Sequence, residues 1–475
     1  MDAKPTPHFN RHLTLFDAIG VVVCAMIGSG IFIVSSQAAA DLQSGSLLLV
    51  AWLVSGVMTA IGAFCFAELA ADSPEVGGQY VYIKNAWGKF PSFLYGWTLS
   101  FVIKSGSIAA VALGFCKFLS ILLPQINGFN LQAGALVISS QKLIAIFLIL
   151  GLTLINSWSV KIVARIQNVV SVTNWLALIL IILVGVFASF HTSQFIQNIS
   201  LVSAFNAWDL QSVLTMGIAL VGPLFAMEGW NNVACIAAEI KRPEKNLPLA
   251  LVWGTGLTTL LYILVNGVYL SGLTLSEIIH APNGVVGTAF MRSVIGPYGE
   301  EFIAVIIMIA AFGCVNSMIL SGSRALYALA QDQPLLKRIS QLGKNSHVPE
   351  TALWIQAGWS IFLVLSRAFS DLLDYMAFTT LLFYALAVAG LFVLRKRDKT
   401  NTKQIYRIWG YPALPILYCV LCTWVMFSLL YLKPISVGIS IGVLLSGWLL
   451  YLGTTKRITA PTEYQDTLGA STAMK

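Results

Sequence analysis

The stretch "AMIGSGIFIV" at residues 25–34 decides the fold of this chain. It lies inside an apolar run, residues 13–40, that is long enough to cross a bilayer, yet Gly28, Ser29 and Gly30 weaken a helix near its middle. Backbone N–H and C=O groups released from a helix are too costly to face lipid, so a break at this depth persists only where it lines a cavity or binds a ligand. We therefore expect an interrupted membrane-spanning helix with a binding role.

The whole chain has the composition of a polytopic membrane protein. Of its 475 residues, 57% are hydrophobic and only 10% are charged, which excludes an ordinary soluble domain. A helix needs about 20 apolar residues to cross about 30 Å of hydrocarbon. Twelve apolar runs can be counted, the fourth of them short: residues 13–40, 47–71, 90–123, 143–155, 166–190, 213–238, 249–273, 302–330, 352–369, 372–394, 412–432 and 435–452. We predict an all-α membrane protein with 12 transmembrane helices.

Basic residues are distributed unevenly between the two sides of these spans. With a cytoplasmic N-terminus, 22 of the 28 Lys and Arg residues lie on the cytoplasmic side. The exceptions are Lys104 and Lys117 within the third span, and Lys142, Arg292, Arg367 and Lys433 outside. We expect both termini to be cytoplasmic. The net charge of +8 then reflects topology and contact with anionic headgroups of the bilayer, and no nucleic-acid partner is expected.

No polar linker separates soluble domains, so one membrane domain is expected. We divide the chain into a cytoplasmic tail, a membrane core of ten helices, a cytoplasmic loop, two further helices and a second cytoplasmic tail. Their bounds are residues 1–12, 13–394, 395–411, 412–454 and 455–475.

A second break is predicted five spans after the first. The stretch "VGPLFAMEGWNN" at residues 221–232 places Gly222, Pro223 and Gly229, together with Glu228, in the middle of the sixth span. Because five is odd, the sixth span enters from the opposite side, and paired breaks of this kind indicate an inverted-repeat transporter. A single small-residue triplet is more often a helix-packing seam. The second break favours a binding role for the first.

The two breaks together suit a zwitterion. The half-helix that begins near Ile31 presents backbone N–H groups and the positive end of its dipole, which favour a carboxylate. Carbonyl groups near Ile27, Phe225 and Ala226 favour an ammonium group. The glycines of the first break allow close backbone approach, and Ser29 adds a hydroxyl donor. A free amino acid carries both charged groups on one carbon, so we expect it as the substrate.

Several long motifs resemble a known family, the amino acid, polyamine and organocation (APC) superfamily. The likeness is closest to its L-type amino acid transporter branch and the bacterial relatives of that branch. The motifs are "IGSGIF" at 27–32, "PEVGGQYVYIKNAWGKFPSFLYGW" at 74–97, "NSWSVKIVARIQ" at 156–167, "FAMEGWNNVACIAAEIKRPEKNLPLAL" at 225–251 and "SGSRALYALAQD" at 321–332. The resemblance covers roughly residues 12–450.

This resemblance implies a LeuT-like fold, with a five-plus-five inverted repeat, discontinuous helices 1 and 6, and two extra helices. It implies amino acid transport by alternating access in the cell (inner) membrane, without a cofactor. Phe225 would act as the extracellular gate. The substrate-binding residues implied are Ile27, Gly28, Ser29, Gly30 and Ile31 of the first helix, and Phe225, Ala226, Glu228, Gly229 and Asn231 of the sixth.

Three positions are candidates for coupling transport to a proton or charge. Glu228 stands where L-type transporters usually have a small residue, and it could bind a proton, bind a cationic substrate or pair within the protein. Lys104 lies about thirteen residues into the third span, too deep to reach headgroups easily, where an ionisable group is a functional candidate or part of an ion pair. We hypothesise that Lys104 and Glu228 are electrostatically coupled. Asn174 replaces a lysine that many members of the branch carry.

Sodium coupling and a covalent partner are both unexpected. Sodium-coupled relatives place paired hydroxyls on the eighth span, whereas this chain has Ala310 and Ala311 there, and a hard cation needs oxygen ligands. No metal site is expected. The segment 124–141 contains no cysteine, so we expect no covalent heavy-chain subunit of the kind typical of animal L-type transporters.

Other classes of function fit the sequence less well. An enzyme would need converging catalytic groups, but the chain contains no HExxH, GxSxG or phosphate-binding loop. The histidines lie at termini and in loops: His8, His12, His191, His280 and His347. A channel would need a continuous pore. Within transporters, the alternatives are a cationic amino acid or polyamine antiporter, motivated by Glu228, and a proton-coupled symporter.

Overall fold

The computed structural model describes residues 13–73, 78–128, 130–133, 136–158, 176, 178–187, 192–200, 209–235, 240–331, 338–343, 348–366, 369–397 and 406–459. Its long helices include α3 (Gly45–Asp72), α6 (Ser105–Leu122), α7 (Ser140–Trp158), α13 (Pro243–Gly272), α16 (Pro297–Gln331), α17 (Glu350–Ser366), α18 (Phe369–Arg397), α19 (Ala413–Leu432) and α20 (Pro434–Thr459). The ten-residue α5 (Lys89–Thr98) comes before α6 in the chain. The shorter ones are α1 (Leu15–Met26), α2 (Gly30–Leu42), α4 (Gln79–Trp87), α9 (Thr192–Ser200), α10 (Leu210–Ala219), α11 (Val221–Ala226), α12 (Asn232–Cys235), α14 (Leu275–Ile279) and α15 (Val286–Ile295).

Eight apolar helices are long enough to cross a membrane in the part of the chain that the structure describes. They coincide with the predicted spans 2, 3, 4, 7, 8, 10, 11 and 12. Predicted spans 1 and 6 are each divided into shorter helices, as the glycines suggested. The ninth is the 17-residue α17. Of the fifth, only residue 176 and the helix Leu178–Phe187 are described.

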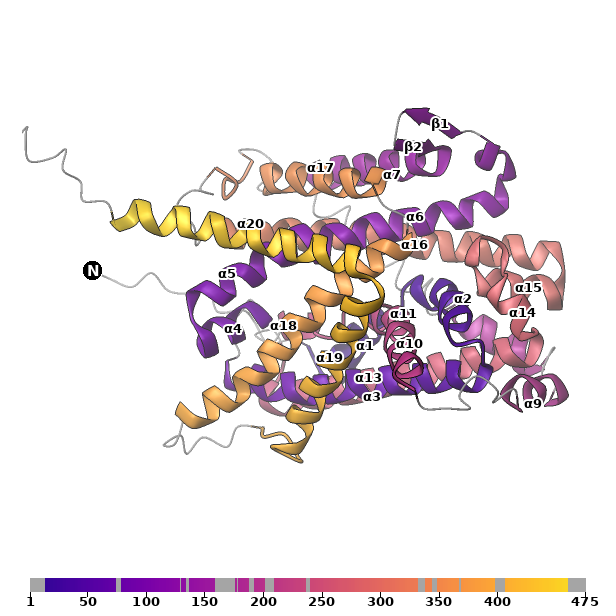
Figure 1. Cartoon of the computed structure of the whole chain (residues 1–475), viewed down its shortest axis with the longest axis horizontal. Helices are drawn as coiled ribbons and strands as arrows, with labels where there is room; N and C mark the ends of the chain where they lie inside the picture. The colour runs from indigo at the N-terminus through magenta and orange to yellow at the C-terminus, as the bar shows by residue number, and fades with distance from the viewer. Residues whose placement is uncertain are drawn as a thin grey trace, which may run out of the picture.

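The described part of the chain is almost entirely helical, as the all-α prediction states, and one short hairpin accompanies the helices. Strands β1 (Asn130–Ala133) and β2 (Leu136–Ser139) pair in antiparallel orientation. Each strand has only four residues, too few for a recognisable period of two in the sequence. Figure 1 shows the hairpin at the same end of the molecule as α14 and α15, opposite the C-terminal end of α20. The sequence analysis predicts that these segments lie outside the cell and the C-terminus inside, and after that prediction we name the hairpin end the outer end.

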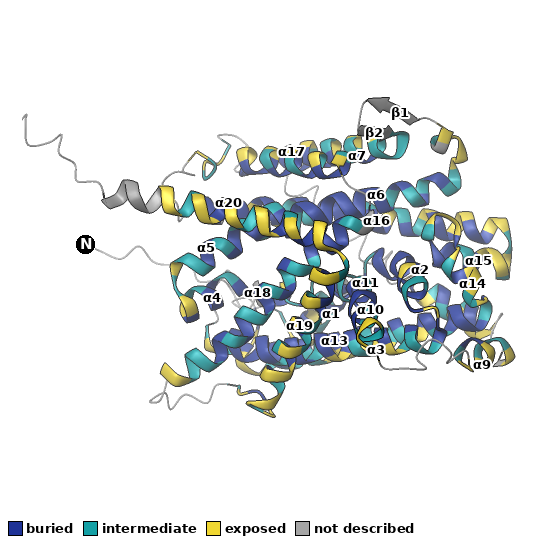
Figure 2. Ribbon diagram, in the orientation of Figure 1, coloured by how far each residue is buried: buried dark blue, intermediate teal, exposed yellow. Residues whose placement is uncertain are grey.

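The divided helices lie in the interior of the bundle (Figure 1). α1 packs against α13, and α2 packs against both α10 and α11. The residues of α2 are mostly buried, whereas much of α20 is exposed (Figure 2). The exposed residues of α20 include the large apolar Leu445, Trp448 and Leu449. An apolar exposed face of this kind is what a helix in contact with lipid presents. The interrupted segments are therefore shielded from lipid by the longer helices.

A buried ion pair ties α3 to α18 at the end opposite the hairpin. Arg395 donates from Nε and Nη2 to the two carboxylate oxygens of Glu68, both at 2.7 Å. The backbone N–H of Ile408 donates to the same carboxylate at 2.7 Å, and the Arg395 guanidinium lies 3.7 Å from the ring centre of Tyr411. Bidentate geometry with further hydrogen bonds is the arrangement in which a buried pair is compensated.

A π-helical turn, η1 (Leu99–Lys104), joins α5 to α6. Wider turns leave main-chain groups without their usual intrahelical partners. Here the carbonyl of Phe101 accepts hydrogen bonds from Trp359 Nε1 at 2.6 Å and from the hydroxyl of Tyr375 at 3.2 Å. The turn is thus held by α17 and α18, and it sets the direction of the residues that follow it in α6.

Candidate functional site

The first break separates α1 from α2 by three residues. α1 ends at Met26, Ile27 is extended with φ −74° and ψ 99°, and α2 begins at Gly30 with Ser29 as its N-cap. Ser29 makes no side-chain capping bond. The first N–H groups of α2 have no acceptor within their own helix, because a helix start lacks the preceding carbonyls. The prediction that this span is discontinuous is confirmed.

The second break lies between α11 and α12. α11 ends at Ala226, Met227 caps it, and Gly229 has a φ of +100°, a conformation that residues with a side chain rarely adopt. α12 begins at Asn232. Residues 227–231 therefore form a turn, and this discontinuity too is confirmed.

The two breaks contact each other through their glycines. A Cβ on Gly30 would lie 3.1 Å from both Cα and Cβ of Ala226, and a Cβ on Gly229 would lie 2.7 Å from the carbonyl oxygen of Ala25. Such distances are shorter than ordinary van der Waals contact. Glycine at these two positions is what lets the main chains of the first and sixth predicted spans approach each other.

Tyr262 of α13 links the carbonyl ends of both half-helices. Its hydroxyl lies 2.8 Å from the carbonyl oxygen of Met26 and 3.2 Å from that of Ala226, and it can donate to either. The ring is fully buried and packs edge-on against Trp52 at 5.2 Å. The sequence analysis missed Tyr262, because nothing in its spacing shows that it reaches a break 36 residues earlier.

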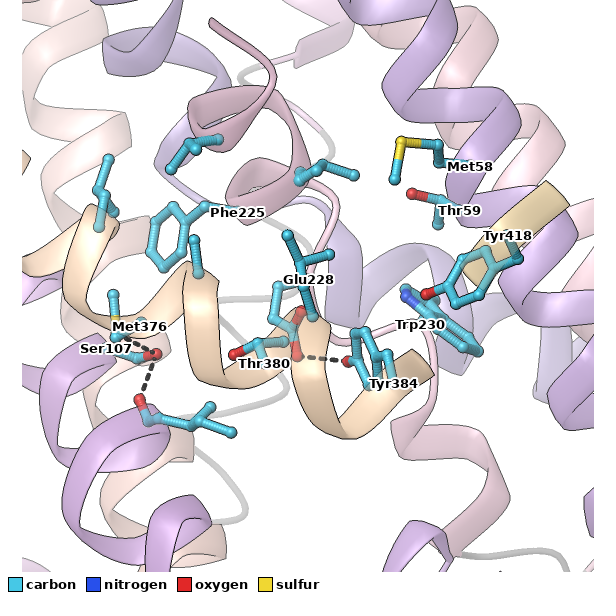
Figure 3. Close-up of a pocket in the computed structure, with 16 residues that line it drawn as sticks. Met58, Thr59, Ser107, Phe225, Glu228, Trp230, Met376, Thr380, Tyr384 and Tyr418 are labelled. Atoms are coloured by element: carbon cyan, nitrogen blue, oxygen red, sulfur yellow. Dashed lines mark hydrogen bonds between the residues drawn. The ribbon is translucent and has the colours of Figure 1, made fainter. Parts of the chain in front are cut away.

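A small inner cavity of about 50 Å³ lies beside the second break. Its wall comes from α3, η1, α6, α11, the turn after α11, α18 and α19 (Figure 3). Among the predicted substrate-binding residues, Phe225 and Glu228 line this cavity. The others are not part of its wall: Ile27, Gly28, Ser29, Gly30, Ile31, Ala226, Gly229 and Asn231. The cavity thus lies on the α18 side of the breaks.

The acid of the second break is held by a tyrosine of α18. The hydroxyl of Tyr384 donates to Glu228 Oε1 at 2.7 Å, as Figure 3 shows. The Tyr384 ring in turn packs against Phe66 at 5.6 Å and Trp230 at 5.5 Å. Glu228 therefore presents one fixed carboxylate, surrounded by aromatic rings, to the cavity.

The predicted coupling residues are only partly brought together. Lys104, the last residue of η1, is half-buried and close enough to Glu228 for an electrostatic interaction. No ion pair joins the two among the described residues. On α16, a Cβ on Gly322 would lie 3.0 Å from the Cβ of Lys104. Asn174 lies outside the described residues.

α16 comes close to the first break at Cys314. Ala310 and Ala311 are buried, and the sulfur of Cys314 lies 3.4 Å from the position of a Cβ on Gly28. Across the described ranges there is no cluster of three or more His, Cys, Asp or Glu residues that could hold a metal ion.

Comparison with known proteins identifies the relatives of this chain. A family model described as "Amino acid permease" matches residues 13–453. The serine/threonine exchanger SteT of Bacillus subtilis (strain 168) is 29% identical over 449 residues, covering 94% of this chain and 97% of that protein. The large neutral amino acids transporter small subunit 2 of Rattus norvegicus is 29% identical, covering 93% and 80%. The b(0,+)-type amino acid transporter 1 of Oryctolagus cuniculus is 29% identical, covering 85% and 80%.

Proposed function

Because this chain belongs to the amino acid permease family, we propose that it exchanges free amino acids, chiefly neutral ones, across the cell membrane by alternating access and without sodium. The observation that carries this proposal is the contact between the two helix breaks, where Gly30 meets Ala226. Interrupted helices in contact inside a bundle are the arrangement with which secondary transporters bind substrate.

The two breaks supply complementary charges for a zwitterion. The start of α2 offers N–H groups and a positive dipole end for the carboxylate, and the end of α11 offers carbonyl groups for the ammonium. The hydroxyl of Tyr262 can donate a hydrogen bond to the carbonyl of Met26 or of Ala226. It therefore uses part of the acceptor capacity that these two carbonyls offer. We assign the substrate to Ile27, Gly28, Ser29, Gly30, Ile31, Phe225, Ala226, Glu228, Gly229 and Asn231, with Phe225 as the gate on the outer side.

The described conformation is a closed one in this proposal. The inner cavity of about 50 Å³ is well below the roughly 300–1,000 Å³ of typical ligand pockets. Alternating access would enlarge it toward one side of the membrane at a time. We propose twelve transmembrane helices, a five-plus-five inverted repeat and cytoplasmic termini, supported by the two broken helices and by the basic residues gathered on one side.

Sodium independence is proposed from the chemistry of α16. Ala310 and Ala311 supply no oxygen ligand for a hard cation beside the first break. Exchange, in preference to one-way transport, is suggested by the name of the Bacillus relative, a serine/threonine exchanger. We propose no covalent heavy chain, since segment 124–141 has no cysteine.

Reconstitution in liposomes tests the function directly. Vesicles are loaded with a mixed pool of amino acids, and entry of labelled external amino acids is measured with and without sodium or a pH gradient. We expect entry of neutral amino acids that requires the internal pool and is the same in sodium and choline buffers. Entry that needs sodium would contradict sodium independence, and single-channel currents would indicate a channel.

A proton-coupled or cation-carrying mechanism is the second candidate, and Glu228 is the observation that favours it. Its carboxylate faces the inner cavity and is close enough to Lys104 for an electrostatic interaction. If the two are coupled, Glu228→Gln and Lys104→Met should each lower uptake roughly tenfold, equivalent to about 1.4 kcal/mol, and flatten its pH dependence. The exposed Lys89→Met is a matched control that should change neither. Unchanged uptake and pH profile in both variants would disprove the coupling.

A further inference from the structure

A second, larger cavity opens toward the outer end of the molecule. Its volume is about 450 Å³, within the range of typical ligand pockets, and it lies between α2, α6, the start of α7, α10, α11 and α18. Ser139, Gly284 and Lys433 of its wall come from three connections that the sequence places outside the cell. We call it the outer cavity.

The outer cavity is separated from the inner one by a thin partition. Val221 of α11 and Leu373 of α18 line both cavities. Both side chains are apolar and nearly fully buried. A solute that enters the outer cavity therefore lies one layer of side chains away from the inner cavity, and Phe225 lies one helical turn beyond Val221.

Charged side chains of both signs line this wall. Lys117 of α6 and Lys142 of α7 form a basic side. The ammonium group of Lys117 lies beside Gly284, 3.7 Å from the position a Cβ would take there. Lys142 donates one hydrogen bond to the carbonyl of Leu365 at 2.8 Å, and an ammonium group has three donors. Lys142 thus has further N–H donors for a ligand, and Lys117 adds a second positive charge to this wall.

The acidic side lies on α2 and α18. Asp41 and Asp374 line the cavity, and Lys433 is close to both, 3.8 Å from Asp374 Oδ2. One ammonium group against two carboxylates leaves this side with excess negative charge. Asp374 itself is buried, where ionic interactions are screened less than at an open surface.

We propose that the outer cavity is a separate binding site for zwitterions, where an amino acid docks before passing the Val221–Leu373 partition. Its carboxylate faces Lys117 and Lys142, and its ammonium faces Asp41 and Asp374. Two walls of opposite charge attract a zwitterion in a fixed orientation and raise its local concentration. This inference rests on the proposed function and names where its substrate first binds.

Blocking the partition separates this site from the one at the helix breaks. In the Leu373→Trp variant, a larger side chain would close the partition, and binding of a labelled neutral amino acid that the wild type exchanges is then measured on purified protein in nanodiscs. We expect the variant to lose exchange but to retain binding, and added Lys117→Met to weaken that binding at least tenfold. The carboxamide of the same amino acid, which lacks the carboxylate, should not compete. Binding that is absent, or is independent of Lys117, overturns the proposal.

The unblocked protein provides a second measurement, which remains informative if Leu373→Trp does not fold. Lys117→Met should lower the initial rate of entry at low external amino acid roughly tenfold, about 1.4 kcal/mol, and Lys117→Arg should restore most of it. Lys89→Met removes the same charge from an exposed position at the start of α5 and should leave the rate unchanged. Equal rates for Lys117→Met and the wild type overturn the proposal. A wild type that exchanges no amino acid would instead refute the proposed function itself.

Discussion

The two helix breaks use glycine for different reasons. In the first, no glycine has a positive φ among the described residues, and Gly30 is needed because Ala226 lies 3.1 Å from where its Cβ would be. In the second, Gly229 combines a φ of +100° with a distance of only 2.7 Å to the carbonyl of Ala25. Packing alone thus requires glycine in the first break, whereas packing and backbone conformation both require it in the second.

The two breaks also differ in the chemical groups that they present. The first break presents main-chain groups and no charged side chain, whereas the second also carries Glu228, fixed by Tyr384 toward the inner cavity. The hydroxyl of Tyr262 lies within hydrogen-bond distance of one carbonyl from each break, and its single O–H can donate to either. The loss of stability caused by a substitution should therefore differ between these positions in a predictable order.

Gly229→Val should have the largest effect. A β-branched residue at φ +100° is strained, and its Cβ would overlap the carbonyl of Ala25. We expect a loss of about 3 kcal/mol or more in the free energy of unfolding, seen as a lower midpoint in thermal unfolding of the purified protein. Gly20→Val, at a position in α1 with no atom within 4 Å of its Cβ, is the control. Equal midpoints for the two variants would contradict the assigned strain.

Tyr262→Phe should come next. It removes the hydroxyl that bonds to the carbonyls of Met26 and Ala226, which costs about 1–3 kcal/mol when a buried acceptor loses its donor. Tyr269→Phe on the same helix is a matched control, because the equally buried Tyr269 hydroxyl has no hydrogen-bond partner among the described residues. Tyr262→Phe should therefore have a clearly lower midpoint of thermal unfolding than Tyr269→Phe. If Tyr269→Phe destabilises the protein as much as Tyr262→Phe, the link between the breaks contributes nothing specific.

The smallest expected difference in stability is between two substitutions within the first break. Gly30→Ala should cost about 1 kcal/mol, since the methyl group would press on Ala226. Gly28→Ala should change stability by less than about 0.5 kcal/mol, because its methyl group would meet only Cys314 Sγ at an ordinary contact distance of 3.4 Å. Denaturation midpoints of the two variants test this order, and a reversed order would contradict the close packing of Gly30 against Ala226.

The positions of the breaks could be predicted from the sequence because glycine and proline weaken a helix by local effects that do not depend on tertiary packing. The discontinuities at residues 27–29 and 227–231 were predicted from Gly28, Gly30, Gly222 and Gly229. Topological reasoning paired the two breaks, and the structure brings them into contact. Local rules of helix formation were sufficient for this part.

The surroundings of the breaks could not be predicted in the same way. Tyr262 and Tyr384 are ordinary aromatic residues of apolar helices, and only tertiary packing brings their hydroxyls to Met26 and Glu228. The charged wall of the outer cavity has the same origin, since residues such as Asp41 and Lys142 are far apart along the chain. The hairpin at residues 130–139 was missed because its strands are too short to show alternation.

The π-helical turn at Leu99–Lys104 gives the third predicted span an offset that a regular helix would lack. Such a turn holds about one residue more than an α-helical turn, and one residue corresponds to about 100° of rotation around the axis. Deleting a single residue there would rotate Ser107 and the rest of α6 around the helix axis by about 100°. The inner cavity would lose part of its wall, and Lys117, further along the same helix, would turn away from the outer cavity. One additional residue in this turn thus determines which side chains of α6 line the inner cavity and the outer cavity.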